Sequence, residues 1–506
     1  MTFKTNAEMK KILVANRGEI ALRIMRSARE MNIKTVAVFS EADRLARHVQ
    51  FADEAIFIGE SPSNLSYLNI EKIISACKAT NADAVHPGYG FLSENPLFAK
   101  ALQKENIKLI GPSPEAMEIM GNKLSAKAAA LSYNIPMVKG TKSAISHVDE
   151  AILEAEKIGF PILIKAAAGG GGKGMRIVRR KENFEEELRQ AVSEAKSAFG
   201  DESVFLESYI TSPKHIEIQI LADDFGNIIH LFERECSIQR RYQKVVEEAP
   251  SPLLPEKIRQ EMGECAVNVA RSCNYVGAGT VEFIVDENFN FFFLEMNTRL
   301  QVEHPITEMI TAVDLVKEQI KIAQGKTLTL SQRDLKINGH AIELRIYAED
   351  PENNFLPDIG TLKTYKLPEG PGIRVDNAYA PGMEISVYYD PMISKLIAWG
   401  STRAEAIGRM KLAISEYDIT GIQSTLPFGT FVLNHPKFIS GAYTTAFVES
   451  FFTDQTFDDK CEKEATIAAL LINHLVNKRK QGNGTSSTSI KKHSPASNWK
   501  KNRITN

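Results

Sequence analysis

Three observations predict a mixed α/β and α+β protein built from three parts. Residues 12–39 read as strand, helix and strand, the pattern of a parallel-sheet unit. Four consecutive glycines at 169–172 stand between two short apolar runs. Polar and apolar residues then alternate through 215–236 and 280–300, as they do in antiparallel hairpins. We therefore expect an N-terminal parallel-sheet domain, a glycine-rich lid and a C-terminal antiparallel-sheet domain.

Composition limits the class of protein. A chain of 506 residues exceeds one core, and its net charge of -2 gives no attraction for nucleic acid or anionic membrane. No apolar run approaches the roughly 18 residues of a membrane span, and the first residues lack a signal-peptide core. Five scattered cysteines without a CxxC pair favour a reducing compartment. We expect a cytoplasmic protein that contacts neither nucleic acid nor membrane.

The N-terminal α/β domain is expected at residues 10–121. Its strand–helix–strand unit comprises 12–15, about 19–31 and 35–39. Two further strands are expected within 82–95, where the strand enters a Gly/Pro loop, and within 107–113. The alternation of strands and helices favours a parallel sheet.

The lid is expected at residues 136–207 and contains the glycine run. Residues 169–174 fit G-x-G-x-x-G, but a strand-like segment follows where that motif requires a helix. A Walker A loop is excluded because Gly174 stands where Ser or Thr must bind magnesium. A hairpin remains, whose glycine tip can bend over phosphates with Lys165 beside it. A plain hairpin without a ligand is the alternative.

The C-terminal part, expected at 208–457, carries a row of polar side chains. If the strand through "FFFLEMNTRLQVEHP" stays extended, one face presents Glu295, Asn297, Arg299, Gln301 and Glu303. Symmetric pairing of the hairpin sets Glu282 opposite Glu295, where the two carboxylates repel unless a hard cation lies between them. Oxygen atoms of Glu282, Glu295 and Asn297 suit Mg²⁺. The alternative is a solvated sheet face. Together with the glycine hairpin, the metal interpretation predicts an ATP clamp.

Two further stretches place polar groups together. His215, Glu217 and Gln219 alternate with isoleucines, and Arg240, Arg241 and Lys244 form a cationic group suited to an anionic substrate. Either can equally be a solvated charged surface. Residues 458–506 form a polar tail whose last 30 residues hold eight Lys/Arg and no Asp or Glu, so we expect its end to be disordered.

Eight stretches in one order, over about residues 10–450, closely resemble biotin carboxylase, the ATP-grasp component of biotin-dependent carboxylases. They are "ANRGEIALRI", "HPGYGFLSEN", "MGNK", "KAAAGGGGKGM", "HIEIQ", "ERECSIQRRYQKVVEEAP", "EMNTRLQVEHPITEMITAVDL" and "RIYAEDP". The resemblance implies an ATP-grasp fold with a mobile central lid and, at 10–121, the domain that precedes it. It also implies a subunit of an acyl-CoA carboxylase such as acetyl-CoA or propionyl-CoA carboxylase.

The resemblance implies roles for individual residues. Nucleotide-binding positions are Lys123, Lys165, Gly171, Gly172, Glu207, Ile210, His215, Gln239 and Tyr242, the last standing where many relatives have histidine. Metal ligands for Mg²⁺ or Mn²⁺ are Glu282, Glu295 and Asn297, of which the two glutamates also contact the nucleotide. The bicarbonate pocket comprises Lys244, Arg299, Gln301 and Val302, with Glu303 as general base and Arg345 facing biotin.

The implied activity is carboxylation of biotin with ATP and bicarbonate through carboxyphosphate. The implied partners are a separate biotin carboxyl carrier protein and a carboxyltransferase subunit, with the chain itself in a homodimer or a larger complex. No Ala-Met-Lys-Met biotin attachment sequence is present, and the nearest text, at 409–415, reads as helix. Two rivals remain: an ATP-grasp ligase that transfers an acyl phosphate to an amine, and a non-catalytic ATP-binding regulator.

Overall fold

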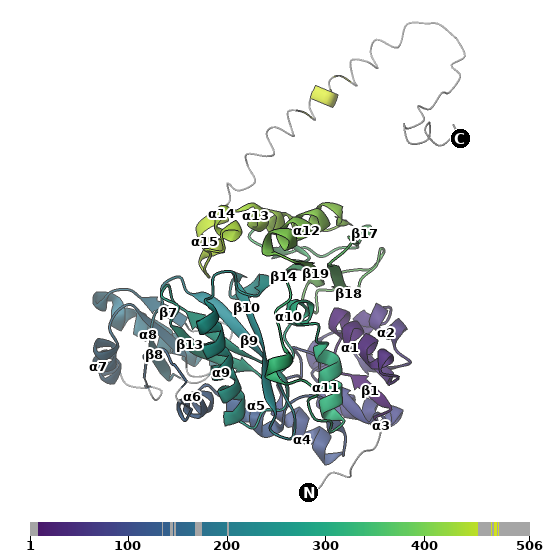
Figure 1. The fold of residues 1–506 in the computed structure, drawn as a ribbon, viewed down its shortest axis with the longest axis horizontal. Coiled ribbons are helices and arrows are strands. Elements are labelled where there is room, and N and C mark those ends of the chain that lie inside the picture. The colour runs from purple at the N-terminus through teal and green to yellow at the C-terminus, as the bar shows by residue number, and fades with distance from the viewer. Residues whose placement is uncertain are drawn as a thin grey trace. The chain divides into compact units, whose positions relative to one another are not determined.

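The computed structural model describes residues 9–133, 135–141, 145, 148–166, 175–199 and 202–453, with 467, 470–472 and 474. The chain forms two units, Met1–Phe451 and Phe452–Asn506. All elements named below lie in the first unit (Figure 1). Within the second, the described residues 467, 470–472 and 474 are helical and exposed. The glycine run and the end of the tail lie outside the described residues.

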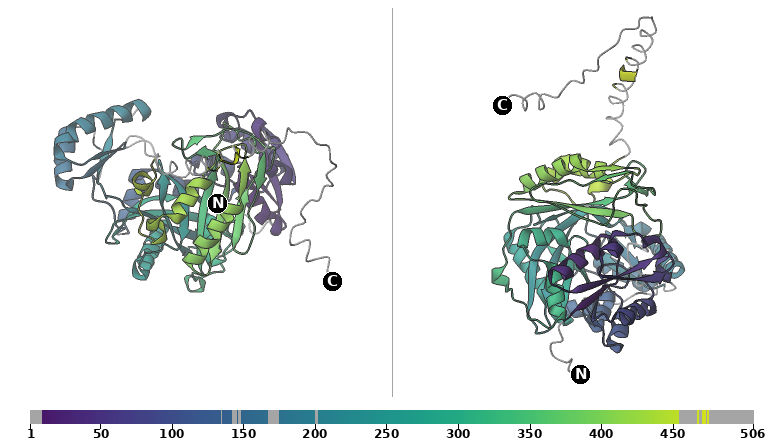
Figure 2. Two further views of the ribbon diagram at one scale, coloured as in Figure 1. Left: turned by 90° about the horizontal axis from the view of Figure 1, so that it is seen from above. Right: turned by 90° about the vertical axis from the view of Figure 1, so that its right-hand side faces the viewer.

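A five-stranded parallel sheet in the order β3-β2-β1-β4-β5 forms the N-terminal domain (Figure 2, purple in the right-hand view). Its strands are β1 (Lys11–Val14), β2 (Lys34–Ser40), β3 (Glu54–Gly59), β4 (Ala84–His86) and β5 (Lys108–Leu109). Helices of this part of the chain are α1 (Gly18–Glu30), α2 (Arg47–Phe51), α3 (Ile70–Thr80), α4 (Pro96–Lys104), α5 (Pro114–Gly121) and α6 (Lys123–Leu131). The predicted parallel sheet is confirmed, with strand ends shifted by one or two residues.

Strand order reverses beside β1, because the chain adds β2 on one side and β4 on the other. Ligands of open α/β sheets bind in the crevice outside the carboxyl ends of the strands at such a reversal. The segments that follow β1 and β4 contain Arg17 and Tyr89. We therefore expect a binding site at the carboxyl ends of these two strands.

The lid contains a small antiparallel sheet in the order β7-β6-β8. Its elements are β6 (Ile162–Ala166), β7 (Met175–Val178), β8 (Val204–Ser208), α7 (Val148–Ile158) and α8 (Phe184–Phe199). Strands β6 and β7 pair antiparallel, so the predicted hairpin on either side of the glycine run is confirmed. Isoleucines, alanines and Phe184 between the sheet and the two helices form a core of its own.

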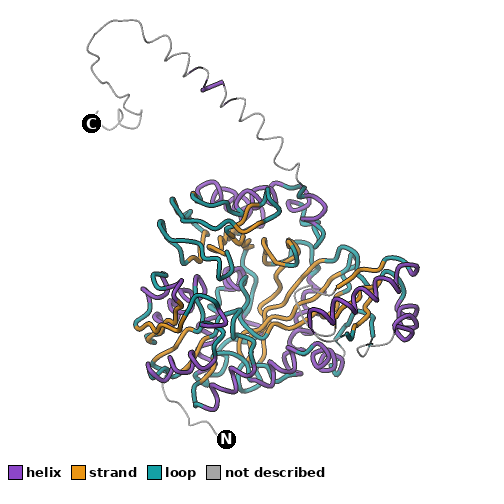
Figure 3. Tube along the Cα trace, turned by 180° about the vertical axis from the view of Figure 1, so that it is seen from behind, coloured by secondary structure: helices purple, strands orange, loops and turns teal. Residues whose placement is uncertain are grey.

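An eight-stranded antiparallel sheet, in the order β13-β12-β9-β10-β11-β14-β19-β18, dominates the rest of the chain (Figure 3). Its strands are β9 (Lys214–Ala222), β10 (Ile228–Arg240), β11 (Gln243–Ala249), β12 (Gly277–Val285), β13 (Phe291–Asn297), β14 (His340–Tyr347), β18 (Ile373–Asn377) and β19 (Met392–Gly400). Two short pairs join β15 (Glu349–Asp350) to β16 (Leu356–Pro357) and β17 (Thr364–Lys366) to β20 (Asp418–Thr420). The predicted antiparallel sheet is confirmed, whereas the domain limits at 136–207, 208–457 and 458–506 stay predictions.

Helices lie between and after these strands, and several of them pack on the sheet. They are α9 (Glu256–Ser272), α10 (His304–Thr311), α11 (Leu315–Ala323), α12 (Arg403–Glu416), α13 (Leu426–Asn434), α14 (Pro436–Ile439) and α15 (Phe447–Phe451). Helix α9 packs on β9 and β10, and α10 packs on β10, β11, β14 and β19. The segment 409–415 lies within α12, as predicted.

Candidate active site

A cavity of about 1290 Å³ lies where the N-terminal domain, the lid strands and the eight-stranded sheet meet. Asn16, Arg17, Tyr89 and Gly90 reach it from the carboxyl ends of β1 and β4, at the reversal of strand order. Of the residues predicted for the site, those that line it are Lys165, Glu207, His215, Gln239, Tyr242, Lys244, Glu282, Glu295, Asn297, Arg299, Gln301, Val302 and Arg345. Segments more than 300 residues apart in the sequence therefore share one pocket.

Two opposed carboxylates occupy one wall of the cavity. Glu282 on β12 pairs directly with Glu295 on β13, so the hairpin register predicted from the sequence is confirmed. Glu282 accepts hydrogen bonds from Asn297 Nδ2 (2.9 Å) and Gln301 Nε2 (3.1 Å), and His215 Nε2 lies 3.0 Å from its other oxygen. None of the described residues donates a hydrogen bond to Glu295. An unpaired carboxylate opposite a second one fits a divalent cation, which supports the predicted metal site.

Lys244 is the charged centre of the pocket. Its ammonium Nζ donates to Glu217 (2.5 Å), Glu282 (2.8 Å) and Glu303 (2.8 Å). Burial opposes this charge, but the three carboxylates outweigh it and raise the pKa of Lys244 well above its ordinary value. Glu217 is itself held by the fully buried Arg234, whose Nε lies 2.5 Å from Oε1. Lys244 is therefore a cation held in one place, as a residue predicted to bind bicarbonate must be.

Glu303 lies between two cations. It accepts from Lys244 through Oε1 and from Arg345 Nη2 through Oε2 (2.9 Å), and it is fully buried at the N-terminus of α10. Burial favours the neutral acid, but Lys244, Arg345 and Arg234 lower the pKa of Glu303 well below its ordinary value. An anion that draws either cation to itself weakens this hold, so Glu303 becomes a stronger base when bicarbonate binds.

Arg345 is held on its other side by Glu247, whose Oε1 accepts from Nε at 2.6 Å. The guanidinium therefore bridges two carboxylates, Glu247 on β11 and Glu303 at the start of α10. Because Arg345 also lines the cavity, it presents a fixed positive charge to whatever enters beside the base.

The predicted row of five polar side chains on one strand is wrong beyond Asn297, where β13 ends. Arg299 and Gln301 follow in irregular backbone, and Glu303 is the N-cap residue directly before α10. Arg299 reaches the site through Glu94 (2.8 Å), Gln301 (2.9 Å) and Asn297 (3.0 Å). Hydrogen bonds between side chains, and not the alternation of a strand, therefore hold Asn297, Arg299 and Gln301 close together.

At the lid, Glu207 on β8 joins two lysines. Its carboxylate accepts from Lys165 Nζ (2.5 Å) on β6 and from Lys127 on α6, and the two lysines lower its pKa against the effect of burial. The predicted Lys165 therefore faces the cavity at the base of the glycine hairpin. Gly171 and Gly172 lie outside the described residues. Lys123 begins α6, and its side chain lies outside the described part.

Some predicted residues lie apart from this cluster. Ile210 follows β8 and does not line the cavity. The predicted cationic group of three is wrong: Arg240 pairs with Glu349, Arg241 donates to Asn354 O, and only Lys244 enters the site. Arg240 and Arg241 contact β15 and the segment after it and do not line the cavity.

Sequence reasoning missed four members of the network: Glu94, Arg234 and Glu247 altogether, and the role of Glu217. Glu94 lies in the Gly/Pro loop after β4, which the sequence did single out, so its partner Arg299 could have been sought there. Arg234 and Glu247 are charged residues within strands that are otherwise buried, a pattern that signals pairing.

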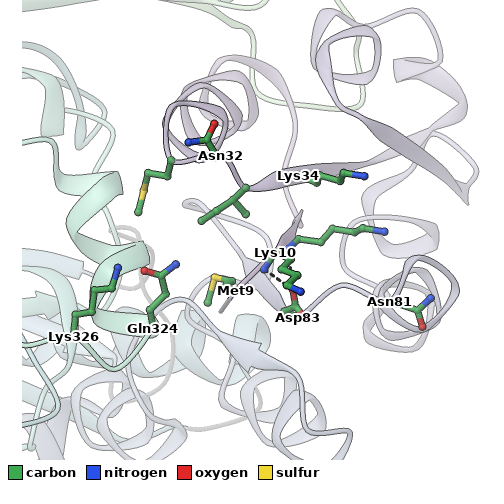
Figure 4. Close-up of a pocket in the computed structure, with 11 residues that line it drawn as sticks. Met9, Lys10, Asn32, Lys34, Asn81, Asp83, Gln324 and Lys326 are labelled. Atoms are coloured by element: carbon green, nitrogen blue, oxygen red, sulfur yellow. Dashed lines mark hydrogen bonds between the residues drawn. The ribbon is translucent and has the colours of Figure 1, made fainter. Parts of the chain in front are cut away.

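A second cavity, of about 710 Å³, lies at the amino ends of β1, β2 and β4 in the N-terminal sheet (Figure 4). Lys10, Lys11, Lys34 and Lys326 line it together with Asn32, Asn81 and Gln324, which stand at the C-terminal ends of α1, α3 and α11. Cations are stabilised at helix C-termini, so these lysines are explained without a ligand.

Three family models match the chain in succession. Residues 8–117 match the biotin carboxylase N-terminal domain, 122–331 the carbamoyl-phosphate synthase L chain ATP-binding domain, and 343–450 the biotin carboxylase C-terminal domain. The first model covers the parallel-sheet domain, the second covers the lid together with β9 to β13, and the third begins within β14.

Curated relatives agree with these models. Biotin carboxylase 1 of Bacillus subtilis is 52% identical over 444 residues, covering 88% of this chain and 99% of the relative. The propionyl-CoA carboxylase alpha chain of Ruegeria pomeroyi is 52% identical over 458 residues, covering 87% of this chain and 67% of the relative.

Solved structures agree as well. The biotin carboxylase of Campylobacter jejuni, in complex with β-γ-ATP, superposes with a TM-score of 0.84 at 46% identity, covering 88% of this chain and 99% of that one. The biotin carboxylase domain dimer of Hydrogenobacter thermophilus 2-oxoglutarate carboxylase, with MgADP, ADP and bicarbonate, gives 0.84 at 48%, covering 88% and 98%. In the part of the chain described here, no helix is both long and apolar enough to cross a membrane.

Proposed function

Since the chain belongs to the biotin carboxylase family, we propose that it carboxylates biotin with ATP and bicarbonate, through carboxyphosphate. The observation that carries this proposal is Glu303, a fully buried carboxylate held between Lys244 and Arg345, both of which line the cavity. A base flanked by two fixed cations suits an anion that must be bound and deprotonated at once.

In the first step, Lys244, Arg299 and Gln301 bind bicarbonate beside Glu303. Glu303 removes the proton of bicarbonate, whose oxygen attacks the γ-phosphorus of ATP while the bond to ADP breaks. Lys244 and Arg299 remain paired with carboxylates until the anions arrive, so their positions are set before the reaction. Carboxyphosphate is the product of this step.

Nucleotide binding falls to the lid and the facing sheet. Lys165 and Glu207 lie at the base of the glycine hairpin, and His215, Gln239 and Tyr242 line the opposite wall. Glu282, Glu295 and Asn297 would hold Mg²⁺ or Mn²⁺, which neutralises charge on the phosphates when bound. Lys123, Gly171, Gly172 and Ile210 are proposed as further nucleotide contacts by resemblance alone.

In the second step, carboxyphosphate breaks down to carbon dioxide and phosphate within the closed cavity. Phosphate removes the ureido proton of biotin, and the nitrogen attacks carbon dioxide. Arg345 stabilises negative charge on the ureido oxygen, since its guanidinium is already fixed between Glu247 and Glu303. Water must be excluded because it destroys carboxyphosphate.

The finer identity of the reaction is also part of the proposal. We assign the chain to the ligases, as a cytoplasmic subunit that acts on a separate biotin carboxyl carrier protein and delivers to a carboxyltransferase subunit. Support for an acyl-CoA carboxylase comes from the propionyl-CoA carboxylase relative, and support for a homodimer comes from the dimeric domain of H. thermophilus.

The test is substrate dependence of ATP cleavage by the purified chain with Mg²⁺. We expect ADP release to require bicarbonate and to increase with free biotin, and labelled bicarbonate to appear in carboxybiotin. A rival ATP-grasp ligase would instead respond to an amine and not to biotin. ATP binding without turnover under all of these conditions would favour a non-catalytic regulator and overturn the proposal.

A further inference from the structure

Three carboxylate oxygens behind Arg345 have no hydrogen-bond partner among the described residues. They are Oε2 of Glu247 and both oxygens of Glu343, and both side chains are fully buried. Buried polar atoms are almost always paired, so three orphaned acceptors beside one another require an explanation. None of the steps above uses Glu343.

The strand register places the two carboxylates together. Glu247 on β11 pairs directly with Glu343 on β14, so both side chains leave the same face of the sheet. Arg345 stands two residues beyond Glu343 on that face and donates to Glu247. Glu343 therefore lies next to the ion pair that holds Arg345.

Cations nearby do not satisfy Glu343. Lys395 stands opposite Arg345 on β19, but its ammonium donates to Val302 O (2.8 Å) and lies near Glu19 and Asp376. Arg345 is used by Glu247 and Glu303. The charged groups around Glu343 are thus Lys395, Arg345, Glu247 and Glu303, and neither cation donates a hydrogen bond to it.

A single proton resolves this arrangement. Two ionised carboxylates at a cross-strand pair repel, and one of them becomes neutral when no cation separates them. Glu247 has Arg345 as its partner, so the proton belongs on Glu343. Burial and the charges of Glu247 and Glu303 raise the pKa of Glu343 well above its ordinary value, against Lys395 and Arg345.

We infer that Glu343 is a neutral carboxylic acid and a positioning residue, which leaves Glu247 as the one ionised partner of Arg345 on this side. Protonation also turns one of the three orphaned acceptors into a hydrogen-bond donor. Arg345 then stays between Glu247 and Glu303 with its charge available to the cavity. The consequence for biotin rests on the proposed function, whereas the protonation itself does not.

The first experiment compares Glu343→Gln and Glu343→Ala in biotin-dependent turnover across a range of pH. The amide mimics the neutral acid, so Glu343→Gln should retain activity at neutral pH and keep it to higher pH than the unaltered protein. Glu343→Ala should lower biotin-dependent kcat by about 10- to 100-fold through misplacement of Arg345. ATP cleavage with bicarbonate alone should change little in either variant.

Three results would overturn the inference. An ionised Glu343 would make Glu343→Gln as defective as Glu343→Ala, and a purely structural role would leave the alkaline limb of Glu343→Gln unchanged. Failure of Glu343→Gln to fold would also contradict it, because a neutral acid is replaced by a neutral group of the same size.

The second experiment measures protonation without activity. The infrared difference spectrum at pH 7, unaltered protein minus Glu343→Gln, should contain a protonated carboxylic acid band. The difference against Glu248→Gln, which removes an ionised carboxylate, should contain none. A Glu343→Gln difference spectrum without that band would refute the assignment. If the band behaves as expected but no carboxybiotin forms in the unaltered protein, the proposed function fails and the protonation stands.

Discussion

Glu247 and Glu248 are neighbours on β11, both fully buried, yet they are held in opposite ways. Glu247 faces the active site, shares Arg345 with Glu303 and has one oxygen without a partner among the described residues, and burial raises its pKa against the charge of Arg345. Glu248 faces away and accepts from His340 (2.6 Å), Arg403 (2.7 and 3.0 Å) and Tyr443. These donors lower its pKa to about 2 against the effect of burial.

The difference separates charges that hold the fold from charges that serve a reaction. On the far face both oxygens of Glu248 have donors, so removing this carboxylate would leave buried charges unpaired and destabilise the native state. On the site face several carboxylates share one cation: the single ammonium of Lys244 pairs with Glu217, Glu282 and Glu303. Such a site keeps its cations ready for incoming anions, at a cost in stability.

The largest effect on activity is expected from Glu303→Gln. Losing the base should lower bicarbonate-dependent ATP cleavage by about 10²- to 10⁴-fold. Stability should change little, because Lys244 retains Glu217 and Glu282 and Arg345 retains Glu247. Steady-state ADP release and the thermal midpoint measure the two outcomes. A variant that is destabilised but still active would contradict the conclusion that the charges of the site face serve the reaction and those of the far face serve stability.

Glu248→Gln should do the reverse. Removing one partner of a buried, charge-assisted network costs about 3–5 kcal/mol of unfolding free energy, measured by denaturant titration. Because the folded pKa is depressed, the carboxylate stabilises the protein above its unfolded pKa of about 4.5 and loses this contribution as pH falls toward 2. The difference in unfolding free energy between the variant and the unaltered protein should therefore become smaller as the pH is lowered. A difference that does not change with pH would mean that the charge of the carboxylate does not contribute to stability.

Glu295→Gln is expected to act through the metal alone. It should raise the Mg²⁺ concentration needed for half-maximal ATP cleavage by about 10- to 100-fold. Without Mg²⁺ the variant should unfold at the same or a higher temperature than the unaltered protein, since one of two opposed charges is removed. An unchanged Mg²⁺ requirement would contradict the metal site.

The alternation of polar and apolar residues along the sequence was enough to predict those parts of the site that lie within a single hairpin. Alternation and turn residues set Glu282 opposite Glu295, and the hairpin of β6 and β7 places Lys165 at the glycine run. The parallel and antiparallel sheets were predictable for the same reason, because periodicity reports which face of an element is buried.

Contacts between distant segments could not be read in this way. Glu94 meets Arg299 across 205 residues, and Arg345 meets Glu247 only because β14 joins β11 in one sheet. Extending the strand past Asn297 failed because the chain turns into α10 there, which alternation cannot reveal. The resemblance supplied Arg299 and Arg345 but not their partners Glu94 and Glu247, and the hydrogen bonds explain how these pairs hold the site together.

The smallest effect is expected at Tyr242, which lines the cavity but is 68% exposed. Its φ of 66° is left-handed, a conformation that His adopts more readily than most residues and that a β-branched residue resists. Tyr242→His should therefore change stability and ATP binding by no more than about 0.5 kcal/mol, or about twofold in KM. Tyr242→Val, the matched control, should lower the thermal midpoint through backbone strain of about 1–3 kcal/mol. If Tyr242→His changes kcat by more than tenfold, this exposed tyrosine takes part in the reaction. The turn between β10 and β11 would then be part of the active site.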